Sequence, residues 1–168
     1  MEEIIRILFI CTGNICRSPT AEGVVRELAA RAGFATRIEL DSAGTHGFHV
    51  GAAPDRRTQA VAARRGYDLS ALRARRVGGG DFVRFDLILA MDRDNLAVLR
   101  QVCPPGLQYK LALFLDYAGD SAAGFAEVPD PYYGGPDGFE RVLDLIEAAG
   151  RALIARLALH PDAAGSAY

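Results

Sequence analysis

The 168-residue sequence contains no tryptophan, a single lysine (Lys110), and no apolar run of the roughly 20 residues needed to cross a bilayer. Its first ten residues lack the basic segment and the small-residue cleavage site of a signal peptide, so we expect a cytoplasmic protein without membrane insertion. Cysteine is scarce as well. Cys11, Cys16 and Cys103 are an odd number, which argues against a secreted disulfide framework and predicts reduced thiols.

Neither the distribution of charge nor the spacing of possible metal ligands indicates a binding site. The 19 basic and 21 acidic residues leave a net charge of -2, so the arginines that crowd residues 56–76 are expected to form a solvated, balanced face and not a nucleic-acid site. A structural zinc site needs closely spaced Cys or His pairs. The chain offers only Cys11 with Cys16 and His46 with His49, so we expect neither zinc nor another metal.

Apolar runs alternate with amphipathic stretches, a pattern typical of parallel strands joined by crossover helices. It predicts a single α/β domain over residues 1–160, with a four-stranded parallel sheet flanked by helices on both faces, followed by a flexible tail at 161–168. The predicted strands are 4–10, 37–42, 85–90 and 111–115, and the predicted helices are 20–32, 54–65, 92–102 and 137–159. Loops are expected at the glycine-rich segments 78–80 and 119–124.

The most informative segment is the junction between the first strand and the first helix, Cys11-Thr-Gly-Asn-Ile-Cys-Arg-Ser-Pro19. Ligands of parallel sheets bind beyond the carboxyl ends of the strands, and a loop that ends at a helix N-terminus directs several N–H groups at one anion. Gly13 and Asn14 tolerate the left-handed backbone angles that curl such a loop. The segment therefore predicts a phosphate site between the first strand and first helix, formed by Thr12, Gly13, Asn14, Ile15, Cys16, Arg17 and Ser18.

Cys11 begins this loop, where the helix dipole, the loop amides and Arg17 all favour its thiolate. Arg17 offers the same anion a planar, bidentate fork that lysine lacks. A buried, inert thiol is the alternative for an isolated cysteine. The Cys-x5-Arg spacing favours instead a phosphate site that carries its own nucleophile.

The segment 11–19 resembles the signature of the low-molecular-weight protein tyrosine phosphatases, Cys-x-Gly-Asn-x-Cys-Arg-Ser-Pro. The similarity extends over nearly the whole chain, through residues 41–44, 47–51, 54–55, 74–75, 91–95 and 130–134. It implies a metal-independent enzyme that needs no cofactor and hydrolyses phosphotyrosine in proteins through a cysteinyl-phosphate intermediate. Phosphotyrosine proteins, and a cognate tyrosine kinase, are the partners it implies.

By position, the resemblance implies Cys11 as nucleophile, Arg17 as phosphate clamp and Asp130 as general acid. Asp130 also suits this role because it precedes Pro131 in a loop; Asp116, Asp120 and Asp137 are the next candidates. The resemblance also implies that Ser18 hydrogen-bonds the Cys11 sulfur, that Asn14 and Ser42 brace the loop, and that Phe48 and Tyr132 wall the substrate cleft, to which Ile15 and Tyr133 can add apolar contact. Cys16, five residues from Cys11, is expected to capture oxidised Cys11 as a disulfide, a role that the resemblance favours; the alternative is a small apolar residue that packs beneath the loop.

Leu72 departs from the resemblance, because some members carry there a histidine that pairs with a glutamate at the position of Glu22. Three other functions are also considered. A phosphoarginine phosphatase of the same fold would be expected to carry threonine in place of Ile15, and an arsenate reductase would need two further cysteines close together where only Cys103 is present. A silent anion-binding module would be expected to lose Cys11 or Asp130.

Overall fold

The computed structural model describes residues 3–119, 124–132 and 134–159. Its sheet has four parallel strands in the order β2-β1-β3-β4, which confirms the predicted fold class. The predicted tail at 161–168, and residues 120–123 of the predicted loop at 119–124, lie outside the described residues. The strands are β1 (Ile5–Cys11), β2 (Ile38–Gly44), β3 (Leu87–Ala90) and β4 (Leu111–Leu113); the helices are α1 (Arg17–Arg31), α2 (Arg56–Arg64), α3 (Gly79–Arg84), α4 (Arg93–Val102) and α5 (Pro136–Leu159), with short 3-10 helices at Ala35–Arg37, Pro105–Lys110 and Phe114–Tyr117.

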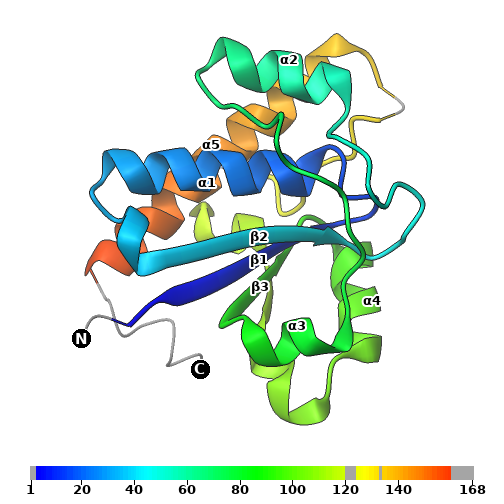
Figure 1. The fold of residues 1–168 in the computed structure, drawn as a ribbon, viewed down its shortest axis with the longest axis vertical. Coiled ribbons are helices and arrows are strands. Elements are labelled where there is room, and N and C mark those ends of the chain that lie inside the picture. Colours follow the sequence, from blue (N-terminus) through cyan, green and yellow to red (C-terminus); the bar gives the residue numbers. More distant parts are fainter. Residues whose placement is uncertain (1–2, 120–123, 133, 160–168) are drawn as a thin grey trace.

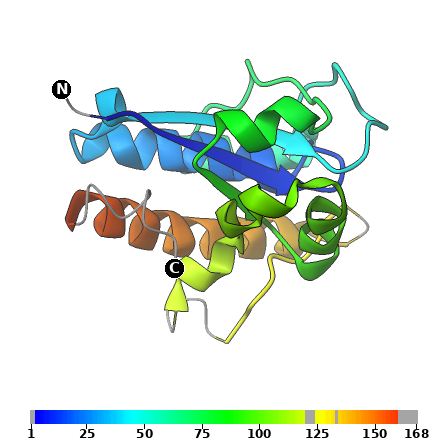
Figure 2. The ribbon, with the colours of Figure 1, turned by 90° about the horizontal axis from the view of Figure 1, so that it is seen from below.

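Helices cover both faces of the sheet, with α1 and α5 on one side and α3 and α4 on the other (Figures 1 and 2). Strand β1 is apolar almost throughout because both of its faces are buried: Ile7 and Phe9 belong to the larger core, Leu8 and Ile10 to the smaller one. None of the described helices is long and apolar enough to cross a membrane.

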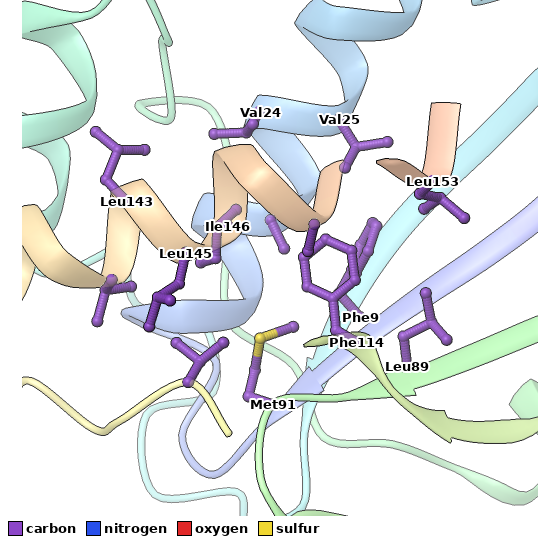
Figure 3. Close-up of a cluster of buried hydrophobic side chains, with 14 of the residues drawn as sticks. Phe9, Val24, Val25, Leu89, Met91, Phe114, Leu143, Leu145, Ile146 and Leu153 are labelled. Carbon is purple, nitrogen blue, oxygen red and sulfur yellow. The ribbon is translucent and has the colours of Figure 1, made fainter. Parts of the chain in front are cut away.

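The larger core lies between the sheet and the α1–α5 pair (Figure 3). Phe9 of β1 meets Phe114 edge-on, with ring centroids 5.1 Å apart. Gly150 lets α5 approach α1 closely, since a Cβ there would lie 3.2 Å from Leu28. This packing fixes α1, whose first turn belongs to the candidate site.

The prediction of a loop at 78–80 was wrong for its last two residues, because α3 begins at Gly79. Glycine is tolerated in the first turn of a helix when contacts of neighbouring residues stabilise that turn. The Asp81 carboxylate accepts a hydrogen bond from the Gly78 N–H at 2.8 Å, and Phe82 and Phe85 are buried in the smaller core. Burial of the two phenylalanines stabilises a helix that its glycine content argues against.

The arginines of segment 56–76 are largely paired with acidic side chains. Arg65, at the C-terminal end of α2, joins three carboxylates of α5, and Arg75 joins two carboxylates beside the sheet. The carboxylates are those of Glu140, Asp144 and Glu147 for Arg65, and of Asp41 and Asp81 for Arg75.

The carboxyl ends of β1, β2 and β3 meet at one edge of the sheet, as parallel pairing requires. Gly44 ends β2 against the loop that follows β1; a Cβ there would lie 2.6 Å from the Thr12 carbonyl oxygen. The Thr45 N–H donates to the Cys11 carbonyl at 2.9 Å. This edge carries the candidate site.

Candidate active site

The loop between β1 and α1 curls at Asn14, whose φ of 58° is the one positive value among the described non-glycine residues. The Asn14 Oδ1 accepts a hydrogen bond from the Arg75 N–H at 3.0 Å, which fixes this conformation. Gly13 was expected to share the left-handed angle, but its φ is not positive. Gly13 instead gives space to the His49 side chain, since a Cβ there would lie 2.9 Å from the His49 ring and the ring would have to shift.

The N-terminus of α1 is left open for an anion. Within the described residues, no side chain caps α1 and its first turn holds no acidic residue, whereas Asp55 caps α2 and Asp92 caps α4. The unpaired N–H groups and the positive end of the helix dipole therefore face the loop. This is the geometry that binds phosphate at helix N-termini.

A pocket of about 170 Å³ lies at this point. Phe48, with 79% of its surface exposed, and Tyr132 are among the residues that line it. The side chains of Asn14 and Ser18 are buried and do not line it, and Tyr133 lies outside the described residues. The lining residues are Cys11, Thr12, Gly13, Ile15, Cys16, Arg17, Phe48, His49, Asp130 and Tyr132.

A chain of buried hydrogen bonds leads to the Cys11 sulfur, and its direction follows from the groups present. The Glu22 carboxylate accepts from the Ser42 hydroxyl at 2.7 Å, so the Ser42 oxygen accepts from Asn14 Nδ2 at 2.9 Å. The second Nδ2 proton of Asn14 goes to the Ser18 oxygen at 2.8 Å. The Ser18 proton can then be donated to the Cys11 sulfur, 3.0 Å away, which is nearer than its other acceptor, the Ala43 carbonyl at 3.5 Å.

Arg17 is 2% exposed and held from several sides. Its Nη1 donates to the Asp92 carboxylate at 2.6 Å and to the Val128 carbonyl at 3.0 Å, while Nη2 lies 3.6 Å from the Asp130 carboxylate. Burial alone would lower the pKa of Arg17, but the adjacent Cys11 sulfur and the two carboxylates outweigh it and raise the pKa above its ordinary value. The guanidinium is therefore a fixed positive charge in the pocket.

Cys16 lies in the same loop in the thiol form. Burial is the main cause that raises its pKa to about 12, with smaller contributions from Asp55, Cys11 and Asp130. All three cysteines are free, and Cys103 is buried in the smaller core on the other face of the sheet. The two loop cysteines thus differ in environment, since only Cys11 receives the Ser18 hydrogen bond.

Two residues of the site were not assigned a role from the sequence. His49, considered only as a zinc ligand, lines the pocket with its ring centroid 6.2 Å from that of Tyr132. Asp92 holds Arg17 and also caps α4. Signals were available for both, because Asp92 follows β3 at the same sheet edge as Cys11 and His49 lies in the segment 47–51 that shares the family resemblance.

Comparison with known proteins agrees with this geometry. Residues 6–162 match the family described as low molecular weight phosphotyrosine protein phosphatase. A low molecular weight protein-tyrosine-phosphatase of Streptomyces coelicolor is 46% identical over 151 residues, which cover 89% of this chain and 92% of that one. The corresponding protein YfkJ of Bacillus subtilis is 42% identical over 92% of this chain and 96% of its own.

Solved structures give the same result. The protein tyrosine phosphatase of Entamoeba histolytica superposes with a TM-score of 0.89 at 39% identity, covering 94% of this chain and 99% of that one. YfkJ superposes with a TM-score of 0.85 at 40% identity, covering 94% of this chain and 96% of that one. Fold, pocket and sequence agree, and the chain belongs to the low molecular weight phosphotyrosine protein phosphatase family.

Proposed function

We propose that this protein-tyrosine phosphatase uses Cys11 as nucleophile, Arg17 as phosphate clamp and Asp130 as general acid. One observation carries the assignment: the Cys11 thiol, the Arg17 guanidinium and the Asp130 carboxylate line the same pocket at the open N-terminus of α1. Among the described residues that line it, Asp130 is the one carboxylate, so Asp116 and Asp137 are less suitable acids. Asp120 lies outside the described residues.

The chemistry proceeds in two displacements. The Cys11 thiolate attacks phosphorus, the bond from phosphorus to the tyrosyl oxygen breaks, and Asp130 protonates the departing phenolate. Arg17 and the N–H groups of the loop balance the charge on the transferring phosphoryl oxygens. Water then attacks the phosphocysteine, Asp130 takes its proton, and inorganic phosphate leaves as the thiolate is restored.

The supporting residues prepare these steps. Ser18 donates to the Cys11 sulfur and stabilises it both as nucleophile and as leaving group, while Asn14 and Ser42 hold Ser18 in place. Ile15 and the rings of Phe48 and Tyr132 offer apolar contact to a tyrosyl ring. An apolar side chain at position 15 favours the aryl ester over phosphoarginine.

Arsenate reduction gains no support either. The reaction would need two further cysteines close together, but Cys16 lies in the loop beside Cys11 whereas Cys103 lies in the core on the opposite face of the sheet. Phosphotyrosine substrates require a tyrosine kinase that makes them, and we propose such a kinase as the functional counterpart. We also propose the cytoplasm as the location, because a catalytic thiol must remain reduced.

Initial tests use p-nitrophenyl phosphate in the presence of EDTA. Turnover is expected to persist in EDTA and to be lost in Cys11→Ser, while Cys103→Ala, which alters a cysteine in the other core, retains activity. Asp130→Asn is expected to slow aryl phosphates by about 10²–10⁴, the usual contribution of a positioned acid. Peptides carrying phosphotyrosine, phosphoserine or phosphoarginine then identify the substrate class, and turnover in Cys11→Ser would exclude the covalent mechanism.

A further inference from the structure

We propose that Arg57 is a positioning residue that holds Asp130 in place for proton transfer, an inference that rests on the proposed role of Asp130. Arg57 is the second residue of α2, outside the pocket. Its Nη2 donates to the Tyr132 carbonyl oxygen at 3.3 Å. The guanidinium also lies 5.6 Å from the Tyr132 ring centroid and 4.7 Å from that of Phe139, within the range of a cation–π contact.

Tyr132 connects this contact to the acid. The Tyr132 N–H donates to Asp130 Oδ1 at 3.1 Å, while its carbonyl accepts from Arg57. The same residue is therefore hydrogen-bonded to the acid on its amino side and to α2 on its carboxyl side. A shift of Tyr132 away from α2 would carry the Asp130 carboxylate with it.

The segment 128–132 is held firmly at its other end. The Val128 N–H donates to the Met91 carbonyl at 2.8 Å, and the Val128 carbonyl accepts from Arg17 at 3.0 Å. The Asp130 side chain itself is 43% exposed and lies 3.6 Å from Arg17, too far for a hydrogen bond. Arg57 therefore supplies the second fixed point of a segment whose acid is otherwise weakly held.

Arg57 can act as a fixed point because it is itself immobilised. Asp55 accepts at Oδ1 from the Arg57 N–H at 2.8 Å and from Nε at 3.1 Å, and at Oδ2 from Nη2 at 2.9 Å. These bonds lower the pKa of Asp55 and raise that of Arg57, so both stay charged. The Asp55 N–H donates to the Ile15 carbonyl at 2.8 Å, which joins Arg57 to the phosphate loop as well.

The neighbouring Arg56 provides a matched control. Arg56 is exposed and carries the same charge one residue away, and among the described residues its side chain makes no hydrogen bond, ion pair or ring contact. Substituting either arginine removes one positive charge from the first turn of α2. Only Arg57→Ala removes the link to Tyr132.

The test is a double-mutant cycle measured as kcat/KM, which reports events up to departure of the leaving group. For phenyl phosphate, whose leaving group needs a proton, Arg57→Ala is expected to lose about tenfold, the order expected for one hydrogen bond and the associated ring contacts. For 2,4-dinitrophenyl phosphate, whose leaving group needs none, the loss is expected to stay below about twofold. In an Asp130→Asn background, Arg57→Ala is expected to cost almost nothing further.

Arg56→Ala is expected to match the wild type, and Arg57→Lys to recover part of the loss, since lysine keeps the charge without the fork. The inference would be overturned if Arg57→Ala lost kcat/KM equally on both substrates, or if its loss added to that of Asp130→Asn. It would also be overturned if Arg56→Ala lost as much as Arg57→Ala. If Asp130→Asn hydrolyses phenyl phosphate at the wild-type rate, the proposed acid is wrong. If Asp130→Asn is slow and Arg57→Ala is not, only the role of Arg57 fails.

Discussion

Replacing Ser18 by alanine removes the hydroxyl that lies 3.0 Å from the Cys11 sulfur. Both Nδ2 protons of Asn14 are already used, one on Ser18 and one on Ser42. The Ser18 oxygen is therefore an acceptor towards Asn14, and its own proton is placed on the Cys11 sulfur at 3.0 Å in preference to the Ala43 carbonyl, the longer contact at 3.5 Å. The direction of this bond makes it a donor to a developing or resting thiolate.

The magnitude follows from the type of bond lost. A buried hydrogen bond to a charged group contributes about 1.5–3 kcal/mol. Loss of that stabilisation from the thiolate corresponds to a factor of roughly 10–150 in a thiolate-dependent rate. The packing cost is smaller, because Ser18 is a short side chain and alanine leaves space for only one oxygen atom. Ser18→Ala also leaves one Asn14 Nδ2 proton without its acceptor, so a loss of folding stability of about 1–3 kcal/mol is expected beside the loss of reactivity.

The assay is alkylation of Cys11 by iodoacetamide at a fixed, mildly acidic pH, followed by loss of phosphatase activity. Ser18→Ala is expected to alkylate about 10–150 times more slowly than the wild type. Thr20→Val serves as control, since the Thr20 hydroxyl is also buried in the first turns of α1 but donates to the Cys16 carbonyl at 2.6 Å. Alkylation of Ser18→Ala at the wild-type rate would refute the argument from hydrogen-bond direction.

Three further predictions concern other parts of the chain. After peroxide, dithiothreitol is expected to restore most activity in the wild type and much less in Cys16→Ser, because Cys16 can form a disulfide with the sulfenic acid of Cys11 and release water; equal recovery would leave Cys16 a packing residue. Burial and the Glu147 hydrogen bond raise the pKa of Tyr67 from 10.0 to about 12, so the folded state keeps a proton that the unfolded state loses above pH 10. The free energy of unfolding should therefore fall as the pH rises from 10 to 12, less steeply in Tyr67→Phe, in denaturant titrations. Lys110→Met is expected to lower the free energy of unfolding by about 1–3 kcal/mol, because the buried Lys110 ammonium donates to the Phe82 carbonyl at 2.8 Å; an unchanged denaturation midpoint would contradict this.

Strong local patterns predicted most of the fold. Apolar runs predicted β1, β3 and β4, and the alternation of residues 37–42 predicted β2, whose first four residues are only partly buried. Helix α3 was missed because its glycines at 79 and 80 argue for a loop, while the burial of Phe82 and Phe85 that stabilises it is a tertiary effect. Helix α1 was expected to begin at residue 20 and begins at Arg17. The earlier start has no capping residue before it, so the sequence carries no signal for it.

The candidate site was predictable where its residues are contiguous and not where they come from distant segments. The spacing of residues 11–18 predicted a phosphate loop with Cys11 and Arg17, while the roles of Asn14 and Ser18 came from the family resemblance. The partners of Arg17 could not, because Asp92 and Val128 are brought to it by the sheet order and by the backbone path of residues 124–132. A backbone carbonyl such as that of Val128 has no sequence signature at all.

The departure at Leu72 can be interpreted through the same hydrogen-bond chain. Leu72 packs against the larger core and cannot supply the charge that a histidine would give Glu22. Glu22 instead accepts from Arg26, one helical turn along α1, at 2.6 Å, and Arg26 remains about half exposed. With its charge balanced in this way, the Glu22 carboxylate still accepts a hydrogen bond from the Ser42 hydroxyl at 2.7 Å. This bond fixes the Ser42 proton on Glu22, so the Ser42 oxygen can accept from Asn14. In this chain the carboxylate that ends the series of donors is therefore paired with Arg26, at the position where the resemblance would pair it with a histidine from residue 72.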